Sequence, residues 1–456
     1  MIDNVSAMKE FGEVFTPPTI INQLIGDIDY SDDSLKICEP AFGDGRILLF
    51  IKNRLLEYHT EKHIIENMLY GVEIQEKWYD EALETLNAKK YNHNLICASV
   101  LDFTSLFNPL SGWVGIMDWV VANPPFNRNI LKKNDVSPHF WEPSGYTTKL
   151  AYCCFVVMGN YILKPEGKLS YVMPVSYTHN ENTQQFREYL RENVQIDSID
   201  VQEPNVFEGI MIRTGIFKAT KRPHSEPINL TRHWRGTVYN TTTDYNEYGE
   251  IPLFIGDVSK SIYEKVMANK HTLTAYKGWN GVDSYAKFSS SDPNEYEYKY
   301  ANGVDRKGEI TIYSSQYPDK TKAKVNNKKN NVGNYNRFHT KKVMINEVLY
   351  GSMETLNHIK YVIVDELGQY GASPRHTVVT FEDESIEQYI KDISSPVAQM
   401  MLSVMKDYNH NDSKLFYYLP YGLSNITLTD EESEFIQQFG GTVPVLKLST
   451  KTLQLV

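Results

Sequence analysis

Residues 119–126 read Trp-Val-Val-Ala-Asn-Pro-Pro-Phe, and this sequence fixes where a strand ends. The apolar run before Asn123 is typical of a buried strand. Pro124 and Pro125 end that strand, because proline lacks the N–H that a sheet ladder needs and has a fixed φ. Asn123 and Phe126 therefore project from a rigid corner. The amide oxygen, the Pro124 carbonyl and the aromatic ring together suit a flat substrate that carries an amino group.

The first half of the chain alternates strand-like apolar runs with helix-like segments, which predicts an α/β sheet with helices on its faces. The apolar residues between Leu150 and Ile162 recur at helical spacing. The expected parallel strands are Leu35–Glu39, Leu69–Ile74, Asn94–Val100, Trp119–Ala122 and Lys168–Met173.

A polar, proline-bearing stretch at Thr220–Pro227 predicts a linker, and we divide the chain into domains at 1–222 and 223–456. Beyond it Tyr296, Tyr298 and Tyr300 alternate as on a half-buried strand. Two amphipathic helices are expected on either side of Pro396. The second half therefore predicts a mixed α+β domain.

Composition and charge exclude several classes of protein. The apolar fraction of 41% and charged fraction of 23% are those of a globular chain, without a run of apolar residues long enough for a membrane span. The residues at the N-terminus do not form a signal peptide, and the four cysteines fit neither a zinc site nor a disulfide framework. We expect a cytoplasmic protein without a metal ion. The net charge of −11 argues against a protein that coats nucleic acid indiscriminately.

Polar residues stand at the ends of four expected strands, where such folds bind ligands. Glu39 begins a turn with glycines at Gly43 and Gly45, Glu73 ends the second strand, and Asp102 ends the third. Taken alone, the glycine pair fits an ordinary turn, and Glu73 fits a helix cap. With the corner at Asn123 as the fourth, their order is the one that a nucleoside cofactor needs.

With these motifs in place, the sequence resembles the N6-adenine DNA methyltransferases, whose motif Asp/Asn-Pro-Pro-Tyr/Phe matches residues 123–126. Residues 11–17 (Phe-Gly-Glu-Val-Phe-Thr-Pro) are similar to a cofactor motif that precedes the glycine loop in the gamma class. We expect Thr16 to cap a helix that has Pro17 at its first position. The segment from Val206 is similar to a late motif whose aromatic residue, here Phe207, helps to hold a flipped base.

The resemblance covers roughly residues 8–220 and departs from the family in two places. Glu39 stands where the family more often has Asp, and Phe42 where it more often has a small residue. The resemblance implies a Rossmann-like methyltransferase sheet, S-adenosylmethionine as cofactor, and a C-terminal target-recognition domain. The cofactor-binding residues that it implies are Phe15, Thr16, Pro17, Glu39, Pro40, Ala41, Gly43, Gly45, Glu73, Ile74, Asp102, Phe103 and Asn123.

The expected activity is site-specific, adenine-specific methylation of duplex DNA after base flipping, as in restriction-modification. The adenine has to leave the helix because its amine is unreachable inside a duplex. We expect a monomer, and a companion restriction endonuclease as a possible partner. The expected catalytic residues are Asn123, Pro124, Pro125, Phe126 and Phe207.

Other planar amines are the alternative substrates: cytosine N4, RNA adenine N6 or a protein glutamine. A methyltransferase-like module that binds DNA without catalysis is a further alternative. Glutamine methylators need no large recognition domain, and the residues after the linker count against them. Cytosine-N4 enzymes usually resemble Ser-Pro-Pro-Tyr instead. The intact motif at 123–126 counts against an inactive module.

Two segments are expected to contact DNA. Asn127–Thr148 is long and polar and can close beside a flipped base or remain an ordinary surface loop. Residues 320–346 contain no Asp or Glu, and their basic residues are interleaved with aromatic ones, so they can supply phosphate contacts or form a solvated loop. The expected DNA contacts are Arg128, Lys132, Lys133, Lys320, Lys322, Lys324, Lys328, Lys329, Arg337, Lys341 and Lys342.

Reversing the charge of Lys328 and Lys329 tests the basic segment. The double variant Lys328→Glu, Lys329→Glu should bind duplex DNA more weakly, with a flatter dependence of log K on log salt, because each lost phosphate contact removes about 0.9 from the slope. Fluorescence anisotropy at several salt concentrations measures both quantities. An unchanged slope removes these lysines from the interface.

Overall fold

The structure is a computed structural model of the 456-residue chain. It describes residues 16–101, 112–126, 136–144, 150–203, 206–207, 213–269, 273–277, 289–292, 294–296, 298–305, 309–315, 340–346, 361–372, 376–381, 384–405, 419–439, 445–448 and 454–455. The chain divides into two compact units, Met1–Gly256 and Asp257–Val456.

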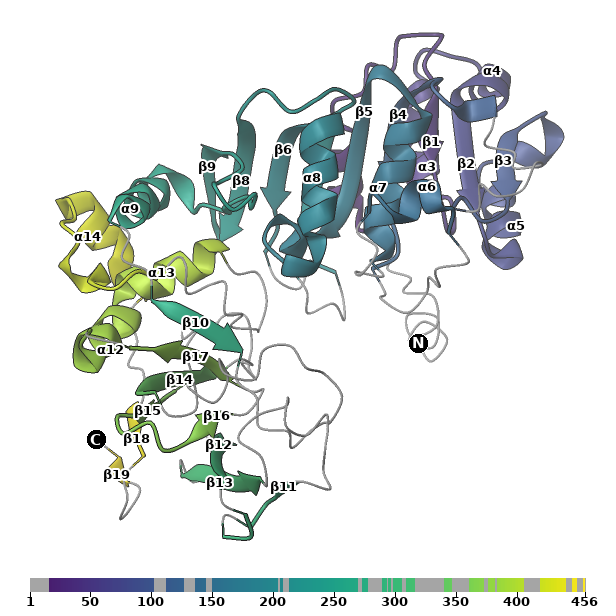
Figure 1. Ribbon diagram of the computed structural model, residues 1–456. Helices are drawn as coiled ribbons and strands as arrows, with labels where there is room; N and C mark the ends of the chain where they lie inside the picture. The colour runs from purple at the N-terminus through teal and green to yellow at the C-terminus, as the bar shows by residue number, and fades with distance from the viewer. Residues whose placement is uncertain are drawn as a thin grey trace. The chain divides into compact units, whose positions relative to one another are not determined.

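The first unit is built on a nine-stranded sheet in the order β3-β2-β1-β4-β5-β7-β6-β8-β9 (Figure 1). Strands β3, β2, β1, β4 and β5 run parallel to one another, whereas β7 is antiparallel to both β5 and β6. The five predicted strands are these five parallel ones. The strands are β1 (Ile37–Glu39), β2 (Leu69–Glu73), β3 (Asn94–Cys97), β4 (Met117–Ala122), β5 (Leu163–Pro174), β6 (Gln195–Val201), β7 (Thr214–Thr220), β8 (Ile228–Trp234) and β9 (Thr237–Thr243).

Helices cover both faces of this sheet, as two neighbouring residues of β5 demonstrate. Ser170 donates to the Leu24 carbonyl of α2 (Pro18–Ile25) at 2.8 Å. Tyr171 donates to the Phe155 carbonyl of α7 (Ala151–Ile162) at 3.1 Å. Successive side chains of a strand point to opposite faces, so α2 and α7 lie on opposite sides.

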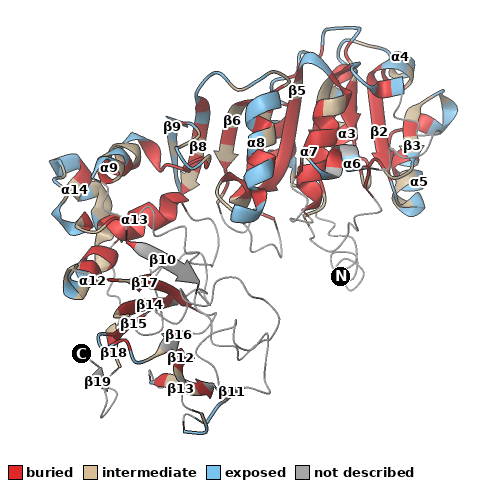
Figure 2. Cartoon of the chain, viewed as in Figure 1, coloured by how far each residue is buried: buried red, intermediate tan, exposed pale blue. Residues whose placement is uncertain are grey.

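The remaining helices of the first unit follow the same division. Helices α3 (Arg46–Leu55) and α5 (Glu76–Thr85) share one hydrophobic cluster with α2. Helices α6 (Pro138–Trp141) and α8 (Gln184–Asn193) lie beside α7 (Figure 1). Helix α7 is buried almost throughout, whereas α5 and α8 each leave one face exposed (Figure 2). The predicted α/β fold with helices on both faces is confirmed.

The structural boundary differs from the predicted one. Thr220–Pro227 is not a linker between units, because β8 pairs in parallel with β6 and β9 pairs with β8, so the sheet continues past it. The first unit ends at Gly256 instead of residue 222. Prolines and polar residues suit an exposed connection between strands as well as a linker. The missed strand signal was the placing of Ile228, Leu230 and Trp234 at alternate positions, and these side chains are buried in β8.

The second unit contains a six-stranded sheet in the order β10-β17-β14-β15-β18-β19 and a four-stranded sheet in the order β11-β13-β12-β16. The predicted helices on either side of Pro396 are α12 and α13, so an α+β unit is confirmed here. Its elements include α9 (Gly256–Ala268), β10 (Thr274–Lys277), β11 (Ser289–Ser290), β12 (Tyr298–Val304), β13 (Ile310–Ser315), β14 (Lys342–Asn346), β15 (Val362–Asp365), β16 (Gly371–Ala372), β17 (His376–Thr380), α12 (Ile386–Ser394), α13 (Pro396–Met405), α14 (Asp430–Ile436), β18 (Val445–Lys447) and β19 (Gln454–Leu455).

Lys342 was predicted to contact DNA, and the structure corrects this. Its side chain is 1% exposed, and its Nζ lies 3.0 Å from Asp365 Oδ2 and 2.9 Å from the Tyr370 carbonyl. Lys342 and Asp365 are direct partners on β14 and β15. Burial lowers the pKa of Lys342, and the attraction of Asp365 opposes that shift. The basic run in the sequence therefore ends inside a sheet.

The four cysteines are free thiols, and Cys97 is exposed. Among the described residues, no helix is both long and apolar enough to cross a bilayer.

Removing the charge of Lys342 should destabilise the second unit. Lys342→Met leaves the Asp365 carboxylate buried without its cation, at a cost of about 3–5 kcal/mol in the free energy of unfolding. Urea unfolding followed by circular dichroism measures the loss. Lys341→Met is the matched control, since the neighbouring Lys341 is partly exposed and, among the described residues, its Nζ bonds to the Glu384 carbonyl at 3.4 Å and to no carboxylate. Equal stability of the two variants would contradict this account.

Candidate functional site

Three predicted site residues meet at the carboxyl edge of the first sheet. Glu39 pairs with Gly71 of β2, so Glu73 lies two residues beyond it. Ile37 pairs with Trp119 of β4, which brings Asn123 to the same level as Glu73. The strand order reverses between β1 and β4, and open α/β sheets bind ligands at such a reversal.

Glu39 is a buried carboxyl group with an unsatisfied oxygen. The residue is 2% exposed, and its Oε2 has no hydrogen-bond partner among the described residues. Desolvation raises the pKa of Glu39 well above its usual value, and the nearby carboxylates of Asp44 and Glu73 raise it further. A buried polar atom without a partner needs an explanation, and a cationic ligand at this edge would supply one.

The glycine turn after Glu39 leaves space at the same edge. Gly43 has φ +52° and Gly45 has φ +77°, a region that favours glycine. A Cβ added at Gly43 would meet no atom within 4 Å. The Gly43 N–H donates to Glu73 Oε2 at 2.9 Å, and Gly45 directly precedes α3. The prediction of a tight strand-to-helix turn is confirmed.

Glu73 and Ile74 end β2 in contrasting environments. Glu73 is buried, and its Oε1 accepts from the Gln75 N–H at 3.0 Å, so both carboxylate oxygens bond to the backbone. Ile74 is 64% exposed. An exposed isoleucine beside this reversal gives the edge an apolar surface that a planar ring can cover.

Phe42 occupies the position where the resemblance leads one to expect a small residue. Its ring lies over Gly71 in β2, and a Cβ added at Gly71 would lie 2.6 Å from Phe42 Cδ1. Gly71 therefore makes room for the larger side chain. A glycine inside a strand signals such a close approach, and this signal was present in the sequence.

The corner after β4 agrees with the strand end expected from its prolines. Pro124 is buried, and Phe126 is partly buried against the hydrophobic cluster that α2, α3 and α5 share. Phe207 is 2% exposed within that cluster. It was predicted to help hold a flipped base, but its ring is covered here by core residues.

Thr16 does not cap a helix, contrary to prediction. Helix α2 begins one residue later than expected, with Pro17 as N-cap and Pro18 at its first position. The Ile21 N–H accordingly bonds to the Pro17 carbonyl at 3.0 Å. The Thr16 hydroxyl instead accepts from Asn123 Nδ2 at 2.9 Å, a bond between residues 107 positions apart. No local sequence pattern reveals such a bond.

The other predicted residues divide between this edge and the rest of the chain. Pro40 and Ala41 lie in the turn after β1 at this edge, where Pro40 is buried and Ala41 partly buried. Lys341 belongs to the second unit. The predicted residues that lie outside the described ones are Phe15, Asp102, Phe103, Arg128, Lys132, Lys133, Lys320, Lys322, Lys324, Lys328, Lys329 and Arg337.

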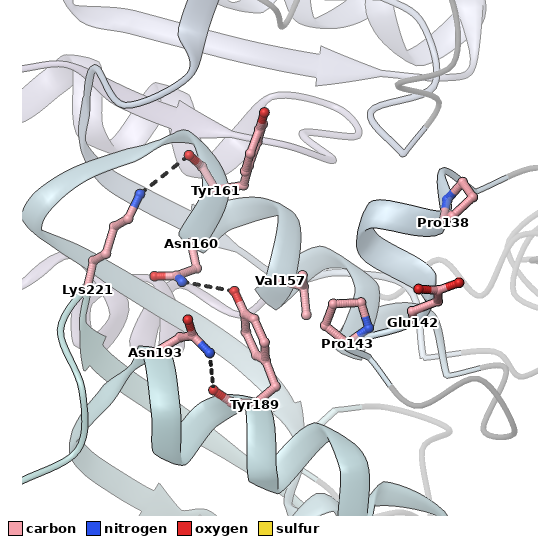
Figure 3. A pocket seen from close by; sticks show the side chains of 9 residues that line it. All are labelled: Pro138, Glu142, Pro143, Val157, Asn160, Tyr161, Tyr189, Asn193 and Lys221. Atoms are coloured by element: carbon pink, nitrogen blue, oxygen red, sulfur yellow. Dashed lines mark hydrogen bonds between the residues drawn. The ribbon is translucent and has the colours of Figure 1, made fainter.

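A pocket of about 530 Å³ lies elsewhere in the first unit, between α6, α7 and α8 (Figure 3). Two of its lining residues bond to each other, since Asn160 Nδ2 donates to the Tyr189 hydroxyl at 2.9 Å, and Lys221 Nζ donates outside the lining to the Leu163 carbonyl at 2.6 Å. None of the predicted site residues lines it.

Comparison with known proteins gives a family match over most of the chain. Residues 3–292 match the family described as N-6 DNA Methylase. The type II methyltransferase M.BanIII of Aneurinibacillus aneurinilyticus is 27% identical over 232 residues, which are 47% of this chain and 39% of that protein. The type II restriction enzyme and methyltransferase RM.BcgI of Heyndrickxia coagulans is 28% identical over 232 residues, 48% of this chain and 33% of that protein.

The chain spans about two fifths or less of the length of these two relatives. Among solved structures, one described as a DrdV–DNA complex matches with a TM-score of 0.51 and 10% sequence identity, covering 95% of this chain and 57% of that one. At this identity the likeness shows a shared fold.

Replacing Glu39 with its neutral amide tests the buried carboxyl group. Because the folded state raises the pKa of Glu39, its ionisation destabilises the fold as pH rises above the usual glutamate value. Glu39→Gln should therefore raise the free energy of unfolding at pH 8 by about 1–3 kcal/mol, with no gain near about pH 4, where both states are protonated.

Thermal unfolding at the two pH values measures the difference. The exposed Glu81→Gln on α5 is the control and should behave like the wild type at both. A Glu39→Gln effect that is the same at both pH values would rule out ionisation as the cause.

Proposed function

The chain belongs to the N-6 DNA methylase family, and from this premise we propose that it transfers a methyl group from S-adenosylmethionine to the N6 atom of a flipped adenine in duplex DNA. One observation carries the proposal: Asn123, Glu39 and Glu73 meet at the carboxyl edge where the strand order reverses. This edge combines a carboxamide for an amine substrate with carboxylates for a nucleoside cofactor.

The residues of the edge fit S-adenosylmethionine. The unsatisfied Oε2 of Glu39 suits the ammonium group of the methionine part. Glu73 is held at the end of β2 by the Gly43 and Gln75 N–H groups, and its carboxylate is proposed to accept from the ribose hydroxyls. Ile74 offers an apolar surface for the adenine ring. When bound, the cofactor supplies an electrophilic methyl group on a sulfonium.

The corner acts on the target amine. The N6 lone pair of adenine is delocalised into the ring and is a poor nucleophile. Hydrogen bonds from N6 to the Asn123 amide oxygen and the Pro124 carbonyl favour a more tetrahedral nitrogen, and they fix its direction of attack. Two prolines and the strand end fix the backbone of the corner, including the Pro124 carbonyl.

Phe126 supports the flipped base. Flipping the base out of the duplex costs a few kcal/mol of free energy. Stacking on an aromatic side chain offsets about 1–3 kcal/mol of this cost per base. Phe126 is partly buried against the core, which fixes its ring while leaving part of it accessible. Phe207 lies in the same cluster, and we assign it a supporting place beneath this corner.

The remaining assignments extend the same proposal. We assign the chain to the gamma class, with a cofactor segment around Phe15–Pro17 ahead of the glycine turn. The second unit is proposed to recognise the DNA target, with the basic segment from Lys320 to Lys341 contacting phosphates. We assign it as a cytoplasmic monomer. A companion restriction endonuclease is proposed because the name of one relative joins restriction enzyme and methyltransferase.

Asn123→Ala should abolish methylation while leaving cofactor binding close to normal. The variant loses the amide acceptor for N6, and removing one such group costs about 10²–10³ in kcat. Transfer of a tritiated methyl group to adenine-containing duplex measures activity, and calorimetry with S-adenosylhomocysteine measures cofactor affinity.

Asn193→Ala on the exposed end of α8 is the control and should keep wild-type turnover. Near-normal transfer by Asn123→Ala would remove Asn123 from the mechanism. Wild-type label that enters RNA or protein but not DNA would refute the proposed substrate.

A further inference from the structure

Thr16 is a buried hydroxyl residue whose only described side-chain partner is Asn123. It is 3% exposed, and its Oγ1 accepts from Asn123 Nδ2 at 2.9 Å. Among the described residues its own hydroxyl proton has no acceptor. Burying a hydroxyl costs free energy unless it is bonded, so this position calls for a role beyond packing.

The chain around Thr16 holds the hydroxyl in place. Pro17 restricts the backbone of the residue before it to extended conformations. Helix α2 then anchors the segment to the sheet, since Ile21 and Leu24 are fully buried and the Leu24 carbonyl accepts from Ser170 at 2.8 Å. Thr16 is therefore a fixed point from which a second element, the end of β4, can be aligned.

A carboxamide has two ends of opposite polarity, and only one of them suits an amine substrate. If the NH₂ end of Asn123 bonds to Thr16, the oxygen end is left for the substrate. If the amide turns over, the oxygen bonds to Thr16 and the NH₂ end opposes the amine of adenine. The polarity of the Thr16 bond therefore decides whether Asn123 can bind its target.

We propose that Thr16 is a positioning residue that holds the Asn123 carboxamide with its oxygen toward the target amine. This inference rests on the proposed methyl transfer. Thr16 keeps this polarity when its own proton is donated elsewhere, because it can then only accept from Asn123. An acceptor on a bound cofactor at the same edge would take that proton. Cofactor binding would then favour the orientation in which the Asn123 oxygen faces the target amine.

Three variants test the role of Thr16. Thr16→Val keeps the shape and removes the hydroxyl, Thr16→Ser keeps the hydroxyl, and Thr19→Val makes the same change on the exposed side of α2. With saturating DNA and cofactor, Thr16→Val should lower kcat about tenfold, since one orienting hydrogen bond is lost. Thr16→Ser should restore most of the rate, and Thr19→Val should equal the wild type.

Binding measurements separate positioning from cofactor contact. For Thr16→Val, we expect the KM for DNA and the Kd for S-adenosylhomocysteine, measured by calorimetry, to change by less than about threefold. A normal kcat with a much weaker cofactor Kd would overturn the proposal, because Thr16 would then only bind the cofactor. Equal losses in Thr16→Val and Thr16→Ser would also overturn it, since the hydroxyl would not be the cause.

A structural readout keeps this test independent of the proposed activity. Crystal structures of the wild type and Thr16→Val should differ in the hydrogen-bond partners of the Asn123 carboxamide. The same orientation in both would refute the role of Thr16, even if the wild type proved inactive on DNA. A wild type without methyl transfer to DNA, but with a reoriented amide in the variant, would instead count against the proposed function alone.

Discussion

The reversal of strand order between β1 and β4 is the constraint on which the candidate site depends. The connections that follow the two strands on each side of the reversal run to opposite faces of the sheet. A crevice where a ligand can bind is therefore left at the carboxyl ends of these strands. Glu39, Glu73 and Asn123 are far apart in sequence, yet the register of three strands brings them to this edge. The short strand β1 is central here because it sets the register of both neighbours.

Much of this edge could be predicted because its signals are local. An apolar run cut short by Pro124 and Pro125 identifies a strand end without knowledge of any neighbour. The glycines after Glu39 likewise identify a turn, and the positive φ angles of Gly43 and Gly45 agree. The order of these motifs along the chain was enough to predict a parallel sheet with helices on both faces.

The features that escaped prediction depend on partners distant in sequence. Lys342 sits at the end of a basic run, and only its strand partner Asp365 explains why it is buried. The bond between Thr16 and Asn123 spans two elements, so helix-capping rules applied to Thr16 alone gave the wrong partner. The continuation of the sheet into β8 was missed for a similar reason, since its proline-bearing approach has the composition of a linker.

The contact between Phe42 and Gly71 has a consequence for divergence among related chains. The aromatic ring occupies the volume that any side chain at 71 would need. The two positions are therefore expected to co-vary, because relatives with an aromatic residue at position 42 should retain glycine at position 71. A side chain gained at position 71 while Phe42 is present would meet the ring, so the residue at position 42 has to become smaller first.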